Sequence, residues 1–212
     1  MIVVEECEVK SGEATLLRPV SFEVPEGEKL LIRGANGAGK STLLSCLAGI
    51  LPPSGGRVLV NQIPANAGVR EFRTLLAACL GTPPMSSDLT VREHLELVAL
   101  SWYPSSADAV ASVTQICGEL GIEAIVQRFP GELSAGQAQL CSLATALVRP
   151  SRVLVLDEPE HRLDAERVAM LGSVLNRRAR AGCALVVATH SEALTHTLGG
   201  RIVELEASRR EL

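Results

Sequence analysis

The sequence predicts an α/β fold with a parallel-sheet core, an N-terminal antiparallel β-subdomain and an inserted helical subdomain. Short apolar strand patterns alternate with helical patterns up to residue 80 and again after Pro150. Between them, residues 81–149 have mainly helical patterns. A glycine-rich turn at residues 34–42 joins a buried strand to a helix, an arrangement that binds phosphate groups at the edge of parallel sheets.

The length fits one domain. A chain of 212 residues is long enough for one α/β domain with a full core and a small inserted subdomain. We therefore expect a single domain over residues 1–212. Residues 1–80 and 150–212 are expected to form the core with its β-subdomain, and residues 81–149 the helical insertion.

Charge and cysteine content limit the partners and the location. The net charge is −4 and the basic residues are scattered, so nucleic acid is not the expected partner. No apolar run approaches the ~18 residues that a membrane-spanning helix needs, and the N-terminus does not resemble a signal peptide. The six cysteines occur singly, without a C-x-x-C pair, which favours a reduced, cytoplasmic protein that uses them as small hydrophobic side chains.

The expected elements follow from periodicity and from capping residues. Strands are expected at 2–9, 14–18, 21–24, 29–32, 57–60, 75–80, 153–156, 184–188 and 202–205. Helices are expected from Lys40 to near Gly49 and at 90–102, 107–120, 134–148, 165–181 and 192–198, with 128–132 as a loop. Thr90 with Glu93 is the expected capping box of the 90–102 helix.

The glycine-rich stretch fits the phosphate-loop pattern G-x-x-x-x-G-K-[ST]. Its glycines allow consecutive N–H groups to turn inward around an anion, and the helix that follows adds its positive end. Lys40 is expected to bind the β- and γ-phosphates, and Ser41 to bind Mg²⁺. The alternative, a glycine-rich turn with a chance lysine, is disfavoured by the flanking strand and helix. The predicted nucleotide-binding residues are Gly34, Ala35, Asn36, Gly37, Ala38, Gly39, Lys40, Ser41 and Thr42.

Two carboxylates follow the apolar strand at 153–156, where a parallel sheet binds ligands. Asp157 is expected to help hold Mg²⁺, and Glu158 to act as the general base toward water. A solvated Asp-Glu turn is the alternative. His190 ends another core strand, and the residues alone leave a structural and a catalytic role equally open. Leu133–Gln137, taken alone, predicts no more than a helix N-cap at Ser134.

In this order and spacing, the motifs resemble the ATP-binding subunit of an ABC transporter over essentially all 212 residues. The resemblance implies a P-loop NTPase fold with Gly34–Thr42 as Walker A and Val153–Glu158 as Walker B. Leu133–Gln137 resembles the LSGGQ signature, with Ala135 at its first glycine. His190 matches the switch histidine and Leu163-Asp164 the end of the D-loop. The small single cassette is similar to haem-exporter-like ATPase subunits.

The resemblance also implies ATP and Mg²⁺ as cofactors and a head-to-tail homodimer or pseudo-dimer on ATP binding. Each phosphate loop would face Ser134 and Gly136 of the other chain, and Gln137 and Asp164 would join the nucleotide site. In the D-loop, Glu160-His161-Arg162 replaces the commoner serine-alanine lead-in, and two further positions depart from the family pattern. Thr82 stands where a metal-binding glutamine is usual, and Ser11 stands where an aromatic residue usually stacks on adenine, which leaves Arg18 as the residue that could lie on the base.

The resulting hypothesis is an ATPase subunit that powers a separately encoded permease, in the cytoplasm and peripheral on the inner face of the cell membrane. The alternative is a soluble ABC-type ATPase acting in assembly or repair, disfavoured because the sequence has neither zinc cysteines nor a basic patch. A nucleotide-binding regulator without activity is disfavoured because Lys40, Asp157, Glu158 and His190 are all present. We also expect Lys40 to face solvent in the absence of nucleotide.

Overall fold

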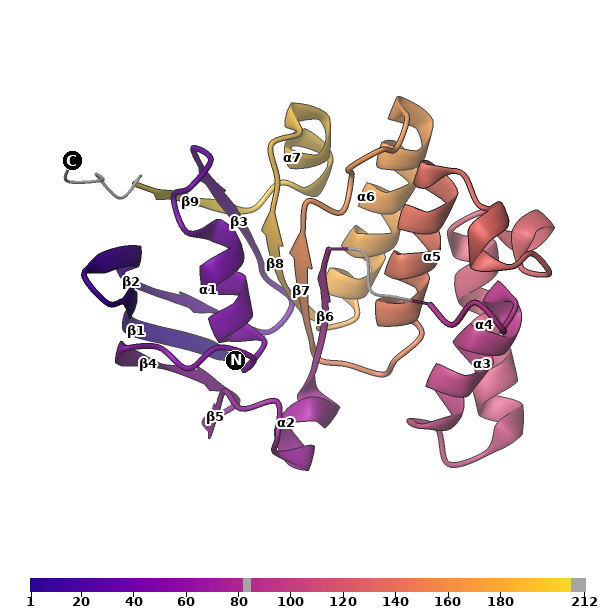
Figure 1. The fold of residues 1–212 in the computed structure, drawn as a ribbon, viewed down its shortest axis with the longest axis horizontal. Helices are drawn as coiled ribbons and strands as arrows, with labels where there is room; N and C mark the ends of the chain where they lie inside the picture. Colours follow the sequence, from indigo (N-terminus) through magenta and orange to yellow (C-terminus); the bar gives the residue numbers. More distant parts are fainter. Residues whose placement is uncertain (82–84, 207–212) are drawn as a thin grey trace.

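A computed structural model describes residues 1–81 and 85–206, and within them the strands form two sheets. The first sheet is antiparallel, in the order β2-β1-β4-β5. Its strands are β1 (Ile2–Ser11), β2 (Ala14–Val24), β4 (Gly55–Val60) and β5 (Ile63–Pro64). It corresponds to the expected β-subdomain and lies at one end of the molecule (Figure 1).

The second sheet is parallel and carries the expected core. Its order is β6-β7-β8-β3-β9, so that the phosphate-loop strand lies two places from the strand that ends in Asp157. The strands are β3 (Lys29–Gly34), β6 (Leu76–Leu80), β7 (Val153–Asp157), β8 (Ala184–Ala188) and β9 (Arg201–Leu205).

Helices cover both faces of the parallel sheet. The α-helices are α1 (Lys40–Leu47), α2 (Arg70–Leu75), α3 (Val91–Leu100), α4 (Ser106–Glu119), α5 (Ala135–Leu147), α6 (Ala165–Arg180) and α7 (Glu192–Leu198). Short 3-10 helices occur at Glu123–Ile125 and Pro130–Glu132. Helix α1 lies between the two sheets, whereas α5 and α6 lie on the other face of the parallel sheet (Figure 1).

The alternation of side chains along the parallel strands divides the core into two apolar clusters. Leu30 and Ile32 of β3 join the cluster around α1 and the antiparallel sheet. Leu31, between them, joins the cluster formed with α3, α4, α5 and α6. Strand β7 divides in the same way, since Val153 and Val155 point to the first cluster and Leu154 and Leu156 to the second. Burial on both faces explains the uninterrupted apolar runs in the sequence.

The α/β fold class is confirmed, and several local expectations were wrong. Pro19 does not interrupt β2, which runs through it from Ala14 to Val24. A proline is tolerated there because β2 is an edge strand and its pairing with β1 shifts register between Leu17 and Val20. Helix α2 and strand β5 were not expected from the sequence, and the loop expected at 128–132 contains the 3-10 turn Pro130–Glu132.

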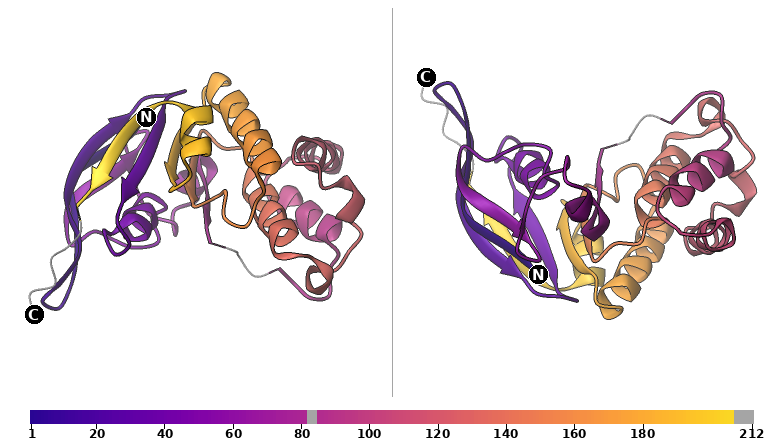
Figure 2. Two further views of the ribbon diagram at one scale, coloured as in Figure 1. Left: turned by 90° about the horizontal axis from the view of Figure 1, so that it is seen from above. Right: turned by 90° about the horizontal axis from the view of Figure 1, so that it is seen from below.

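The helical segment from α3 to α5 enters after β6 and returns to β7. Figure 2 shows the α3–α4 pair and the antiparallel sheet at opposite ends of the molecule. The expected capping box at Thr90 is present, with the Glu93 N–H donating to the Thr90 Oγ1 at 3.3 Å. Helix α5 packs against β6 and shares the apolar cluster of the parallel sheet, so a division of the domain at residues 80 and 150 stays a prediction.

Two further expectations from composition can be compared with the structure. The described residues hold no helix with both the length and the apolar character to cross a bilayer. All six cysteines are buried and free. Burial raises the pKa of Cys183 to about 11 and that of Cys141 to about 12, so these thiols stay protonated and pack as hydrophobic side chains.

Candidate functional site

The carboxyl ends of three parallel strands meet where the sequence predicts the site. Asp157 at the end of β7 pairs in register with Ala188 of β8, and Ala188 pairs with Ile32 of β3. Backbone hydrogen bonds continue past the strands: the Glu158 N–H donates to Ala188 O at 2.9 Å, and the Thr189 N–H to Ile32 O at 3.3 Å. These bonds fix the chain directions that lead into the phosphate loop, the carboxylate pair and His190.

The phosphate loop follows β3 and ends at Gly39, the N-cap residue of α1. Gly39 is the N-cap of α1 and has φ +94°. A Cβ atom at Gly39 would lie 2.6 Å from the carbonyl oxygen of Leu16, which excludes any larger residue. The same constraint holds at Gly34, where a Cβ would lie 2.6 Å from Leu205 O. The loop is therefore fitted between β2 and β9, and the first N–H groups of α1 remain available to an anion.

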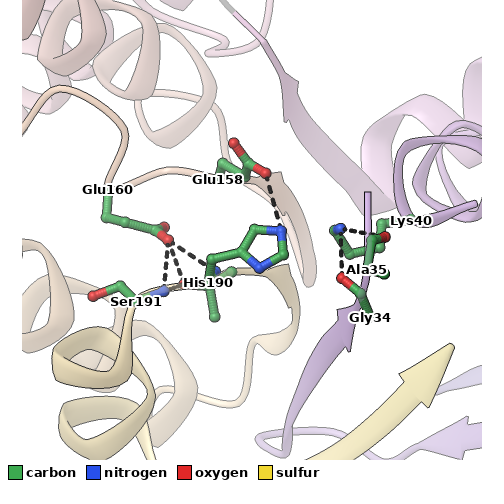
Figure 3. Close-up of polar contacts among 8 residues, drawn as sticks. Gly34, Ala35, Lys40, Glu158, Glu160, His190 and Ser191 are labelled. Atoms are coloured by element: carbon green, nitrogen blue, oxygen red, sulfur yellow. Dashed lines mark hydrogen bonds and ion pairs between the residues drawn. The ribbon is translucent and has the colours of Figure 1, made fainter. Parts of the chain in front are cut away.

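Lys40 does not face solvent, so that expectation was wrong. The residue is 7% exposed, and its ammonium donates to Gly34 O at 2.9 Å and to Ala35 O at 3.2 Å (Figure 3). The physical reason is that the loop curls over the first turn of α1 and turns two carbonyl oxygens toward the side chain. A phosphate bound by this ammonium would have to compete with the two carbonyl oxygens.

An open pocket next to the loop is lined by Ser41, Asp157 and Glu158 together with Gly81, Gln139 and His161. Hydroxyl and carboxylate oxygens are ligands that suit Mg²⁺, which usually completes its shell with phosphate oxygens and water. No cluster of three or more His, Cys, Asp or Glu residues suited to a metal occurs among the described residues. Thr82, the third expected metal ligand, lies outside the described residues.

Glu158 and His190 lie beside each other. The His190 Nε2 is 3.6 Å from the Glu158 Oε1 (Figure 3). Glu158 has φ +45°, a left-handed conformation that costs a non-glycine residue about 1–3 kcal/mol. Such strain occurs where surrounding contacts impose it, and here the bond from Glu158 N–H to Ala188 O contributes. The two side chains, both about half exposed, are thus close enough to act on one group, and a shared role stays a prediction.

The expected signature residues lie at the start of α5 and do not line this pocket. Ser134 caps α5 in a capping box with Gln137, whose Oε1 accepts the Ser134 N–H at 2.9 Å. Gly136 is buried, and a Cβ there would lie 2.7 Å from Arg162 O, which explains why glycine is needed at this position. Asp164 caps α6 by accepting the Arg167 N–H at 2.9 Å. Within one chain, the signature and the D-loop thus contact each other.

Three residues of this pocket, Gly81, Gln139 and His161, were not predicted as site residues. Gln139 is 5% exposed, and its Nε2 donates to the carbonyl of Pro159 at 3.2 Å. His161 occupies a D-loop position where proteins of the family that the sequence resembles usually have serine. The departure of Glu160-His161-Arg162 from the family pattern was visible in the sequence. The sequence alone does not show which of these three side chains the folded loop turns toward the pocket.

The predicted base-binding surface lacks an aromatic ring. Ser11, at the end of β1, is exposed. Arg18, the expected replacement, pairs with Glu206 at 3.0 Å and lines a second pocket with Ala38 of the phosphate loop and Leu205. Because both partners are substantially exposed, the pair contributes about 0–1 kcal/mol, and Arg18 can leave it for a purine at little cost.

Comparison with known proteins shows the family of the chain. A family model described as ABC transporter matches residues 17–161. A shorter match, over residues 128–195, is to a family described as AAA domain, putative AbiEii toxin, Type IV TA system. The cytochrome c biogenesis ATP-binding export protein CcmA of Xanthomonas campestris pv. campestris is 33% identical over 198 residues, which is 93% of this chain and 90% of the relative.

Solved structures agree with the fold. The ATP-binding subunit of an ABC transporter superposes with a TM-score of 0.88 and 26% identity, over 98% of this chain and 88% of that one. A dimeric post-hydrolysis state of the ATP-binding cassette MJ0796, bound to ADP and Pi, gives a TM-score of 0.84 and 25% identity over 99% and 97% of the two chains.

Replacing Lys40 should abolish most ATP turnover and leave the fold intact. Lys40→Met keeps the aliphatic stem and removes the charge that balances the phosphates, so kcat should fall about 10²- to 10³-fold. Lys40→Ala should lose as much. Steady-state phosphate release measures the effect, and thermal melting checks the fold. Near-normal hydrolysis by Lys40→Met, or an unfolded variant, would contradict the role given to the ammonium.

The isolated chain should bind nucleotides weakly and discriminate poorly between ATP and GTP. Aromatic stacking is worth about 0.5–1.5 kcal/mol, so its absence costs roughly three- to tenfold in affinity. Competition binding with ATP, GTP and CTP measures the selectivity. Arg18→Ala should weaken purine binding, whereas Arg57→Ala, which breaks a comparable exposed pair with Glu5 on the same sheet, should not. A preference for ATP above about thirtyfold that Arg18→Ala leaves unchanged would mean that another contact reads the base.

Proposed function

The chain belongs to the ABC transporter family of ATP-binding proteins, and we propose that it is the ATP-hydrolysing subunit that powers a separately encoded permease. One observation carries the proposal: the phosphate loop, the carboxylate pair and His190 follow three adjacent parallel strands whose ends are joined by hydrogen bonds. A phosphate-binding loop alone serves many functions. A carboxylate base and an imidazole beside it are the additional groups that hydrolysis requires.

In the proposed reaction, the phosphate loop and Lys40 hold the β- and γ-phosphates of ATP. Glu158 accepts a proton from a water molecule while the oxygen of that water attacks the γ-phosphorus. The bond between the γ-phosphorus and the β–γ bridging oxygen breaks, which gives ADP and phosphate. We propose that His190, whose Nε2 lies 3.6 Å from Glu158 Oε1, orients that carboxylate and donates a hydrogen bond to the γ-phosphate. Ser41 and Asp157 are the residues that would hold Mg²⁺, which supplies charge neutralisation at the phosphates.

The proposed active assembly is a head-to-tail dimer of two cassettes. Ser134 is exposed at the N-terminus of α5 and does not line its own chain's phosphate-side pocket. A helix start with a serine and small residues presents N–H donors to an anion. We infer that this donor set acts on nucleotide bound to the other chain, and the dimeric state of a similar cassette supports the inference.

The proposed partner is a membrane permease, which places the chain in the cytoplasm on the inner face of the membrane. The relative from Xanthomonas campestris is described as an export protein, and export is therefore the favoured direction. No described helix could itself span a bilayer, so the transport path is expected in another chain.

Co-purification tests the permease. The tagged chain, isolated from its own cells in mild detergent, should bring down a polytopic membrane protein that mass spectrometry identifies, and that protein should stimulate ATP hydrolysis. A gene for such a protein is expected beside this one. A chain that hydrolyses ATP yet stays in the cytosolic fraction, without any membrane partner, would favour a soluble ATPase instead.

Replacing the proposed base should separate binding from hydrolysis. Glu158→Gln retains the shape of the side chain and cannot accept the proton, so the variant should bind ATP and accumulate as an ATP-bound dimer. Light scattering after size exclusion, with Mg-ATP and with Mg-free ATP, measures the dimer. Glu71→Gln, an exposed carboxylate on α2, is the control and should behave as wild type. A Glu158→Gln chain that stays monomeric under every condition would contradict the dimer.

A further inference from the structure

We propose that Glu160 is a positioning residue for hydrolysis, which fixes the backbone around His190 and so holds the imidazole beside Glu158. The inference rests on the proposed function. Glu160 follows Pro159 just past the end of β7, whereas His190 follows β8. The two segments are joined by one carboxylate oxygen, the Oε1 of Glu160 (Figure 3).

Three donors converge on that oxygen. They are the hydroxyl of Thr189, the N–H of His190 at 3.3 Å and the N–H of Ser191 at 3.2 Å. Thr189 Oγ1 in turn accepts the Ser191 N–H at 3.0 Å, which closes a small network. The two N–H donors, at 3.2 and 3.3 Å, lie at the long end of the usual N–H···O range, so the effect of the network comes from the number of donors that meet at one oxygen. The backbone on both sides of His190 is therefore tied to a single charged group.

The burial of the network adds to its effect. Thr189 is fully buried, and Glu160 is half-buried. The second carboxylate oxygen, Oε2, is also buried and has no hydrogen-bond partner among the described residues. A carboxylate that gives up solvation on one oxygen and commits the other to three donors is not a solvated surface charge.

The imidazole depends on this backbone because little else holds it. The His190 side chain is 48% exposed, and in residues 1–81 and 85–206 it makes one polar contact, the 3.6 Å approach to Glu158. The backbone of residue 190 therefore sets where this side chain begins and which of its rotamers bring Nε2 close to Glu158. Moving that backbone by a fraction of an ångström changes the distance to Glu158 directly.

Glu160 is not needed as the cap of α7, because another residue caps that helix. Ser191 is the N-cap of that helix, and its Oγ accepts the Leu194 N–H at 3.1 Å. The N–H groups that donate to Glu160 belong to His190 and Ser191, which precede the first turn of α7. The geometry therefore assigns Glu160 to the loop that carries His190.

The test is a set of ATPase measurements on the full chain. Glu160→Ala should lower kcat about ten- to a hundredfold, as expected when a catalytic group is displaced, with KM for ATP within about twofold of wild type. Glu160→Gln keeps the length and one acceptor oxygen, so it should retain more activity than Glu160→Ala. Glu192→Gln, an exposed carboxylate in the first turn of α7, is the matched control and should stay near the wild-type rate.

A double-mutant cycle distinguishes positioning from general stabilisation. If Glu160 acts through His190, then adding Glu160→Ala to His190→Ala should cost less than about twofold further. A full additional loss in the His190→Ala background, or a Glu160→Ala chain with wild-type kcat, would overturn the proposal. If Glu160→Ala does not fold, the cycle with Glu160→Gln decides by the same criterion.

The single variants keep this inference separate from the proposed function. Wild-type hydrolysis by both Glu158→Gln and His190→Ala would reject the proposed reaction itself. A loss in both of these variants, together with full activity of Glu160→Ala, would reject only the role of Glu160.

Discussion

The site depends on the parallel pairing of β3, β8 and β7. Each catalytic candidate stands within two residues of a strand end, so the register of the sheet decides whether these side chains meet. The pairs Asp157 with Ala188 and Ala188 with Ile32 set that register. A slip of one residue would exchange the two faces of a strand and move Val155 and Leu156 into the wrong apolar clusters. The two cores therefore protect the geometry of the site as well as the stability of the fold.

The same edge of the sheet explains which parts of the site one chain can assemble. The phosphate loop, Asp157, Glu158 and His190 all follow core strands. The signature residues instead begin α5, a helix held to the core through its other contacts, and they do not line the pocket beside Ser41. The proposed phosphate site and the start of α5 are thus separate places on a single chain. Complementarity between them is what a head-to-tail dimer would use.

The sequence predicted most of the fold because its strongest signals are local. The bounds of β8 and α7 agree with the structure residue for residue, since each is a compact apolar or capped segment. The error at Pro19 came from treating proline as a strand breaker without knowing that β2 lies at an edge. The short α2 and β5 lack the length that periodicity needs.

The site was predictable as a set of motifs and not as a set of contacts. Glycine spacing identified the phosphate loop because backbone geometry demands it, as the close approach of Gly39 to Leu16 O illustrates. The burial of Lys40 was not predictable, because it depends on the carbonyls of Gly34 and Ala35 turning toward the helix. The contact of Glu160 with residues 189–191 joins segments about thirty positions apart, and no local pattern marks it.

The segment from Glu158 to Arg162 has a strained backbone that contacts from α5 and from the β8 side hold in place. Two of its residues, Glu158 and Arg162, have left-handed backbone conformations that are costly for side chains of their size. The segment keeps that conformation because it is held from three sides. Ala188 binds the Glu158 N–H, Gln139 of α5 binds the carbonyl of Pro159, and the loop after β8 binds Glu160. Since Gly136 of α5 also lies against the carbonyl of Arg162, any shift of α5 acts directly on the backbone that carries the proposed base. The helix whose N-terminus is proposed to meet the partner's nucleotide therefore contacts the segment that carries the proposed base of its own chain.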